Sequence, residues 1–177
     1  APGWSSTLDD IVRAALAKWP NVPDCRGWLA LDARGDWYMR DEACQRAGAF
    51  PQPKGSVVRH DKLREFIHRN YEPDADGAWF FQNGPQRVYV ELEAAPLVLR
   101  LLDGEAAVEA HTGQRLAVQS CWLDEFGWLY LLTPRGLGLV HSQDMVGAAD
   151  RIERGEWHPQ PVLRAELPAR FGFRLRP

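Results

Sequence analysis

Cationic side chains and polar amides occur together at two points of the sequence, and this combination suits the binding of a small anion. An arginine–histidine pair stands just before a predicted helix, and a second polar group surrounds a predicted hairpin loop. A guanidinium binds carboxylate or phosphate through paired hydrogen bonds, to which amides add further bonds. We predict a ligand-binding surface here, although an ordinary solvated loop has a similar composition; its residues are Arg59, His60, Gln82, Asn83, Gln86 and Arg87.

A second charged feature lies close to the C-terminal end. The segment 170–176 alternates between arginine and apolar residues or glycine, which predicts a strand with Arg170, Arg174 and Arg176 on one face. Together with Arg164, this face could bind an anion or a carboxylate-rich partner. We favour the alternative, in which the charges protect an edge strand from aggregation.

Acid–base or nucleophilic chemistry finds little support in the sequence. Glu91 and Glu93 alternate onto one face of a strand, where they could serve general acid–base work, but a solvated strand face with Arg87 nearby explains them better. The sequence has no Gly-x-Ser-x-Gly motif, and its Gly136-Leu-Gly138 lies in a predicted hairpin rather than in a phosphate-binding loop. We therefore predict no catalytic residues.

The histidines and cysteines of the sequence do not have the spacing of a metal site or of a Cys-x-x-Cys pair. The five histidines include no His-x-x-x-His, and Cys25, Cys44 and Cys121 form no Cys-x-x-Cys pair. The odd number of cysteines favours a reduced, cytoplasmic setting. The spacing of the histidines and cysteines predicts no metal site, and we predict no cofactor. The sequence starts at Ala1, so a leader could have been removed, but the residues given do not resemble a signal peptide.

Length and charge limit the possible classes of function. A length of 177 residues suits one domain or two small ones packed together, and we predict a single domain, 1–177, that buries a core without metal or disulfide. The net charge of −3 argues against nucleic acid and anionic membranes as partners, and no apolar run is long enough to span a membrane. Eight tryptophans predict a core built from large aromatic side chains.

An acidic turn followed by glycine and tryptophan occurs three times. The copies begin at Asp32, Asp74 and Asp124 and bring Trp37, Trp79 and Trp128 to the start of a strand. Asp and Gly are common in any hairpin turn. The third copy is one residue shorter than the others. The recurrence of a tryptophan after each glycine nevertheless predicts an internal repeat, with units of about 28–71 and 116–153 joined by strands in 78–113.

Hydrophobic periodicity predicts an α+β fold, a bent antiparallel sheet or half-barrel of hairpins with about three helices packed on it. The loop of the central hairpin 78–93 should have roughly three to five residues, because Pro85 has no N–H to donate. A long surface loop is expected at 41–55. The predicted helices are 6–19, 61–70 and 142–154, and the last two strands are 162–167 and 170–176.

The order of four short motifs resembles bacterial families of unknown function with repeated strand–helix motifs. They are Gly35-Asp-Trp-Tyr, Val57-Val-Arg-His-Asp, Asp76-Gly-Ala-Trp-Phe and Val90-Glu-Leu-Glu-Ala-Ala-Pro. The resemblance covers about 28–153 and implies a link to signalling. It carries over no catalytic residues. The sequence departs from the pattern in the loop 41–55, at Asn83-Gly-Pro-Gln and at Glu93-Ala.

Two hypotheses of function follow. The first is a non-enzymatic binding or regulatory module in the cytoplasm, whose partner is a small molecule or a protein. The alternative is an enzyme that acts on a small anionic metabolite and uses Arg59, Arg87 and His60. Nucleic-acid binding through the arginine strand is weaker than either, because the overall charge is negative.

Overall fold

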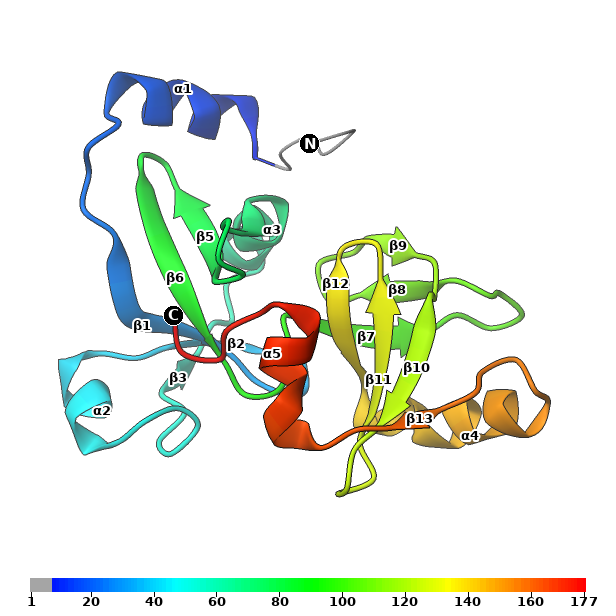
Figure 1. Ribbon diagram of the computed structural model, residues 1–177. Coiled ribbons are helices and arrows are strands. Elements are labelled where there is room, and N and C mark those ends of the chain that lie inside the picture. The colour runs from blue at the N-terminus through cyan, green and yellow to red at the C-terminus, as the bar shows by residue number, and fades with distance from the viewer. Residues whose placement is uncertain (1–7) are drawn as a thin grey trace. The chain divides into compact units, whose positions relative to one another are not determined.

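The computed structural model describes residues 8–177, which form two compact units that are treated separately below (Figure 1). The first unit contains 8–31, 36–93 and 174–177, and the second contains 32–35 and 94–173. Each unit combines one sheet with helices, so the predicted α+β class is confirmed. The described residues form five α-helices rather than about three. The single domain of 1–177 stays a prediction.

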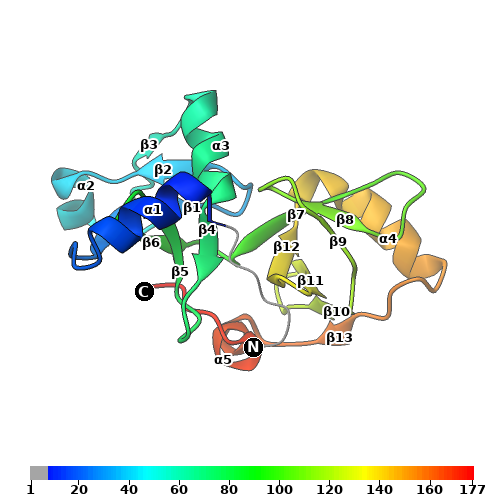
Figure 2. The ribbon, with the colours of Figure 1, turned by 90° about the horizontal axis from the view of Figure 1, so that it is seen from above.

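The first unit is built on a six-stranded sheet in the order β3-β2-β1-β6-β5-β4. Neighbouring strands are antiparallel except for β1 and β6, which are parallel. Seen from above, α1 crosses the hairpin end of β5 and β6 (Figure 2). The strands are β1 (Cys25–Leu31), β2 (Trp37–Met39), β3 (Ser56–Val57), β4 (Tyr71–Pro73), β5 (Trp79–Asn83) and β6 (Gln86–Leu92), and the helices are α1 (Asp10–Lys18), α2 (Glu42–Ala47) and α3 (Asp61–Arg69).

The second unit has a seven-stranded sheet in the order β13-β10-β11-β12-β7-β8-β9. Here β12 pairs in parallel with β7, and β13 in parallel with β10. Its strands are β7 (Leu97–Leu101), β8 (Val108–Ala110), β9 (Arg115–Leu116), β10 (Ser120–Leu123), β11 (Leu129–Thr133), β12 (Gly136–Val140) and β13 (Gln160–Pro161). Its helices are α4 (Met145–Glu153), α5 (Leu167–Phe171) and the short 3₁₀ turns η1 (Ser142–Asp144) and η2 (Arg164–Glu166).

The two sheets share one pairing order. In the first unit the order β4-β5-β6-β1-β2-β3 has a parallel pair only at β6 and β1, and in the second β10-β11-β12-β7-β8-β9 has one only at β12 and β7. The internal repeat stays a prediction. This shared order supports it, with limits near 25–92 and 97–140 rather than 28–71 and 116–153.

All three acidic turns have the same local geometry. The side chain of Asp74 accepts hydrogen bonds from the backbone N–H groups of Asp76 and Ala78, and its carbonyl accepts one from Gly77. Asp32 and Asp124 make equivalent turns, and the glycine of each copy has φ between 82° and 86°. Glycine is required because this left-handed conformation strains other residues. The turns therefore follow from local sequence alone.

The core of the first unit is aromatic, as the tryptophan count predicts. The ring of Tyr71 lies between those of Trp37 and Trp79, at centroid distances of 5.1 and 4.8 Å. The indole N–H of Trp37 donates to Nε2 of His68 over 2.8 Å. His68 on α3 therefore connects the helix to the sheet as a hydrogen-bond acceptor, which requires a neutral imidazole.

We expect this contact to make the chain sensitive to mild acid. Burial, aided by the charge of Arg64, lowers the pKa of His68 from 6.5 to about 4. Because the folded pKa lies below the unfolded one, the stabilisation is complete above pH 6.5 and is lost as the pH falls toward 4. Urea unfolding at several pH values should show this slope, and a His68→Gln variant should lack it. The matched His158→Gln change at an exposed site should keep the slope; an unchanged slope in His68→Gln would contradict the assignment.

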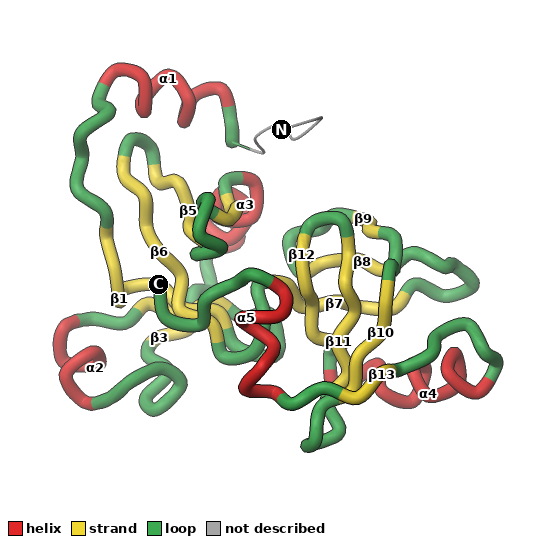
Figure 3. The backbone as a smooth tube through the Cα atoms, viewed as in Figure 1, coloured by secondary structure: helices red, strands yellow, loops and turns green. Residues whose placement is uncertain are grey.

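The predicted C-terminal strands are wrong. Residues 164–171 form η2 and α5, and the residues that follow run as turn and loop (Figure 3). Pro168 stands in the first turn of α5, where its fixed φ suits a helix, and Gly172 ends the helix at φ 69°. These two helix signals outweigh the alternation of arginine and apolar residues.

Two further local predictions differ from the structure. The loop of the central hairpin contains only Gly84 and Pro85, because Asn83 pairs directly with Gln86. Because Gln86, and not Pro85, pairs with Asn83, the missing N–H of Pro85 removes no hydrogen bond from the hairpin. Gly84 adopts the positive φ of 58° that the tight turn needs. The expected loop 41–55 contains the short helix α2, whose first turn is capped by Asp41. The first two residues of the predicted helix 6–19 lie outside the described residues, and within them α1 begins at Asp10.

Candidate functional site

The hairpin residues of the predicted ligand surface support the fold locally. Gln82 is 1% exposed and donates from its side chain to the carbonyl of Gly84. Gln86 donates to the carbonyl of Pro23, while Asn83 is exposed at the tip. Arg87 lies 3.9 Å from the ring of Phe80, where it stacks on the sheet surface. Only part of this predicted surface therefore points freely to solvent.

Arg59 and His60 lie at the other end of α3 from the hairpin tip. Nδ1 of His60 accepts from the N–H of Leu63 and so caps the start of α3, and Arg59 is exposed beside it. The hairpin contacts the far end of the helix, where the N–H of Gln82 donates to the carbonyl of Asn70. A nine-residue helix separates these ends by about 14 Å. The structure does not gather the six residues into one site.

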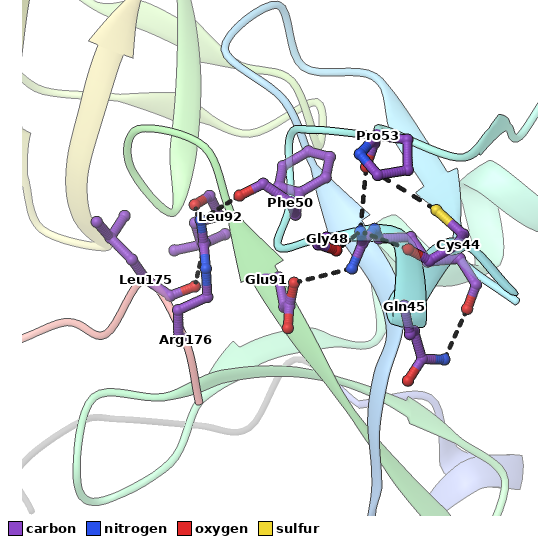
Figure 4. Close-up of polar contacts among 10 residues, drawn as sticks. Cys44, Gln45, Gly48, Phe50, Pro53, Glu91, Leu92, Leu175 and Arg176 are labelled. Carbon is purple, nitrogen blue, oxygen red and sulfur yellow. Dashed lines mark hydrogen bonds and ion pairs between the residues drawn. The ribbon is translucent and has the colours of Figure 1, made fainter. Parts of the chain in front are cut away.

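The C-terminal arginines each contact a different part of the structure. Arg170 on α5 stacks on Trp122 at 4.4 Å, in the second unit. In the first unit Arg174 donates to the carbonyl of Asp76, and Arg176 donates to the carbonyls of Leu92 and Phe50 (Figure 4). The expected common arginine face is absent from the described residues because no strand forms there.

Arg40, which the sequence analysis did not single out, is the main buried cation of the first unit. Its guanidinium donates to the carbonyls of Gly48 at 2.7 Å and Pro53 at 3.1 Å, and it lies 3.5 Å from a carboxylate oxygen of Glu91 (Figure 4). It therefore holds α2 and the loop that follows against β6. Glu93, in contrast, faces Lys54 at 3.8 Å. The two glutamates thus have separate cationic partners, which disfavours a shared catalytic role.

Asp124 is a buried carboxylate of the second unit that, like Arg40 in the first, joins several segments by hydrogen bonds. Its Oδ1 accepts from the N–H groups of Phe126 and Trp128, each at 2.9 Å. Its Oδ2 accepts from the hydroxyl of Tyr130 at 2.8 Å and from Nε of Arg164 at 2.9 Å. The side chain of Asp124 is fully buried, and all its oxygens are satisfied. This carboxylate is therefore a structural anchor rather than a free acid or base.

The electrostatics of this centre follow from its hydrogen bonds. Burial opposes ionisation of Asp124, but the N–H of Trp128, Arg164 and Tyr130 outweigh it and hold the pKa of the carboxyl below its usual value. Burial and the neighbouring carboxylate raise the pKa of Tyr130. At neutral pH the pair is therefore Asp124 anion and Tyr130 phenol, with Arg164 as the counter-charge.

A small pocket of about 260 Å³ lies between two of the acidic turns in the second unit. The turn at Asp32 contributes Ala33 and Arg34, and the turn at Asp124 contributes Gly127 and Trp128. Arg164 lies 4.2 Å from the ring of Trp128 and so fixes one wall. The remaining lining comes from the ends of β11 and β12, η1 and α4, namely Leu129, Leu139, Val140, Ser142 and Met145.

This pocket is apolar except at its rim. Arg34 is exposed, and its guanidinium has no protein partner within residues 8–177. Ser142 supplies the other polar side chain of the lining. The sequence reasoning identified the two turns but not the pocket, since only tertiary folding brings Arg34 near Trp128. The repeated turn motif was the one signal that pointed to these positions.

Other chemistry has no support among the described residues. No group of three His, Cys, Asp or Glu side chains in 8–177 could hold a metal ion. No helix in the same range is long and apolar enough to cross a membrane. The three cysteines are unpaired, and burial raises the pKa of the Cys121 thiol to about 11, which keeps it protonated.

The fold and the pocket define an α+β protein with two sheets of like pairing order and a small apolar cavity. The family model described as "Protein of unknown function (DUF2946)" matches residues 8–177. The chain therefore belongs to this family, in agreement with the resemblance to families of unknown function that its motifs indicate. No curated protein matches the chain.

Two crystal structures of DUF1285 family proteins are similar to this chain. The protein from Shewanella baltica is 17% identical, with a TM-score of 0.49, and the match covers 70% of this chain and 91% of that one. The protein from Silicibacter pomeroyi is 12% identical, with a TM-score of 0.49, and the match covers 80% of this chain and 84% of that one.

Proposed function

We propose that the protein is a non-enzymatic binding module whose pocket takes a small ligand with an apolar body and one anionic group. The observation that carries the proposal is the guanidinium of Arg34, which has no partner within residues 8–177 and lies at the rim of an otherwise apolar cavity. An apolar wall with few polar groups is the usual composition of a small-molecule site. The anion would bind Arg34, and Ser142 could add a hydrogen bond.

The size of the pocket limits the ligand. Its volume of about 260 Å³ is below the roughly 300–1,000 Å³ of sites for drug-sized molecules. Short-chain aliphatic acids and simple aromatic carboxylates fit this limit. The wall formed by Trp128 and Met145 offers an aromatic face and a flexible thioether, both of which pack well on such apolar bodies.

The lining favours binding over catalysis. Among the lining residues within 8–177, Ser142 carries the only side-chain hydroxyl, and no histidine or carboxylate stands beside it to activate it. The alternative, an enzyme that uses Arg59, Arg87 and His60, gains no supporting observation, because His60 caps α3 and Arg87 stacks on Phe80. A regulatory role in bacterial signalling in the cytoplasm is part of the proposal and rests on the motif resemblance.

The proposal is tested with hexanoate and benzoate, compared with hexanamide and benzamide, by ligand-observed NMR on the full chain. We expect at least one acid to bind, and its neutral amide to bind much more weakly. Arg34→Gln should weaken the acid about tenfold, the loss expected for a charge-assisted hydrogen bond. Met145→Trp should fill the cavity and abolish binding.

Arg154→Gln is the matched control, because Arg154 is another exposed arginine of the same unit outside this pocket. It should bind the acid as the unchanged chain does. Failure of both acids to bind, or an equal loss in Arg34→Gln and Arg154→Gln, would refute the assigned pocket.

A further inference from the structure

A groove on the second unit exposes several apolar side chains beside the edge strand β13. Leu123, Phe126 and Leu163 are 39%, 65% and 52% exposed. Leu123 and Leu163 line the groove together with Pro161, and Phe126 follows the lining residue Glu125 in the chain. Scattered single apolar residues are normal on a surface, but a cluster around one groove indicates an interaction site.

The exposed aromatic ring in this cluster is held in place. Arg164 lies 4.3 Å from the centre of the Phe126 ring, and its Nε is bonded to the buried carboxylate of Asp124. The N–H of Phe126 bonds to the same carboxylate. An exposed phenylalanine that is already immobilised loses little further entropy on binding, which is typical of anchor residues in protein interfaces.

The charge of the groove is negative. Glu125 and Glu166 are both exposed lining residues, and the carboxylate of Glu166 has no partner within residues 8–177. The side chain of Glu125 accepts a hydrogen bond from the backbone N–H of Arg164 at the rim. A partner that buries the three apolar side chains must therefore place cations next to these glutamates.

Strand addition is not the mode of binding at this edge. The outer strand β13 consists of Gln160 and Pro161, and Pro159 precedes it. Prolines have no N–H to offer a further strand, so they protect the edge from backbone pairing. A partner must bind through its side chains.

We propose that this groove docks a protein segment whose apolar side chains are flanked by lysine or arginine. The apolar side chains would pack on Leu123, Phe126 and Leu163, and the cations would pair with Glu125 and Glu166. The groove and the small-ligand pocket are lined by different residues.

The test uses a labelled twelve-residue peptide with leucines at helical spacing and lysines elsewhere, and measures fluorescence anisotropy with the full chain. Leu163→Asp and Glu166→Lys should each weaken binding about tenfold or more, as loss of an interface anchor does. Both side chains are exposed, so both variants should fold. A peptide with glutamate in place of lysine should not bind.

Two matched variants separate specific docking from general charge attraction. Val146→Asp changes another exposed apolar residue of the same unit, and Glu153→Lys changes an exposed acid on α4. Both should bind the lysine peptide as the unchanged chain does. Equal losses in the groove and control variants, binding of the glutamate peptide, or absence of binding to the lysine peptide would overturn the proposal.

Discussion

Replacement of Arg40 by alanine should lower the free energy of unfolding by about 3–5 kcal/mol, the cost of leaving a buried charge without its partner. Arg40 is 2% exposed, and Glu91 opposite it is 19% exposed. The substitution also removes the donor to the buried carbonyls of Gly48 and Pro53. Urea unfolding at pH 7, followed by tryptophan fluorescence, measures the effect.

Arg46→Ala is the matched control for this result. Arg46 belongs to the same segment and pairs with Glu42, but their side chains are 72% and 76% exposed. An exposed helical pair contributes only about 0.5 kcal/mol, because water screens it. If both alanine variants lost the same stability, Arg40 would not be the anchor of residues 41–55.

Asp124→Asn should destabilise the chain by about 3 kcal/mol, since it places an amide against Tyr130 and Arg164 where a buried carboxylate accepted both bonds. The matched Asp74→Asn change affects the same turn in the first unit. Oδ2 of Asp74 accepts from Tyr89 and has no arginine hydrogen bond, so this change should cost only about 1 kcal/mol. Equal effects would show that the turn, and not Arg164, sets the energy.

The same variant has a pH signature. The folded pKa of Asp124 is lowered below its ordinary value of 3.8. The stability that it contributes is therefore complete above this value and is lost as the pH falls through the folded pKa. The unchanged chain should lose more stability between about pH 5 and pH 2 than Asp124→Asn does, as measured by urea midpoints. Parallel curves for the two proteins would contradict the ionised, hydrogen-bonded carboxylate.

Local elements were predictable where a few neighbouring residues decide the conformation. The helix at 61–70 and the central hairpin follow from periodicity, and the acidic turns follow from Asp, Gly and their immediate neighbours. The C-terminal segment failed because Pro168 and Gly172 carry helix signals that the alternation concealed. The parallel pairs β1–β6 and β12–β7 could not be predicted, since they join strands far apart in the chain.

The candidate sites show the same division. Arg34 and Trp128 occur in turns that the sequence predicts. That both line one pocket depends on tertiary contacts between segments about 90 residues apart in the chain. The sequence also did not show which arginines would be buried and which would be exposed. Both residues are arginines beside a predicted strand, yet Arg40 is buried and bonded, whereas the guanidinium of Arg34 has no partner in the part of the chain that the structure describes.

The sequence by itself determined the tryptophan-led turns, most helices and the α+β class, because these depend on hydrogen bonds and periodicity within a few residues. The tertiary structure alone decided which charges are buried and where a cavity remains. Burial and pairing depend on contacts between distant segments, as when Arg164 reaches the carboxylate of Asp124, and no local pattern contains that information.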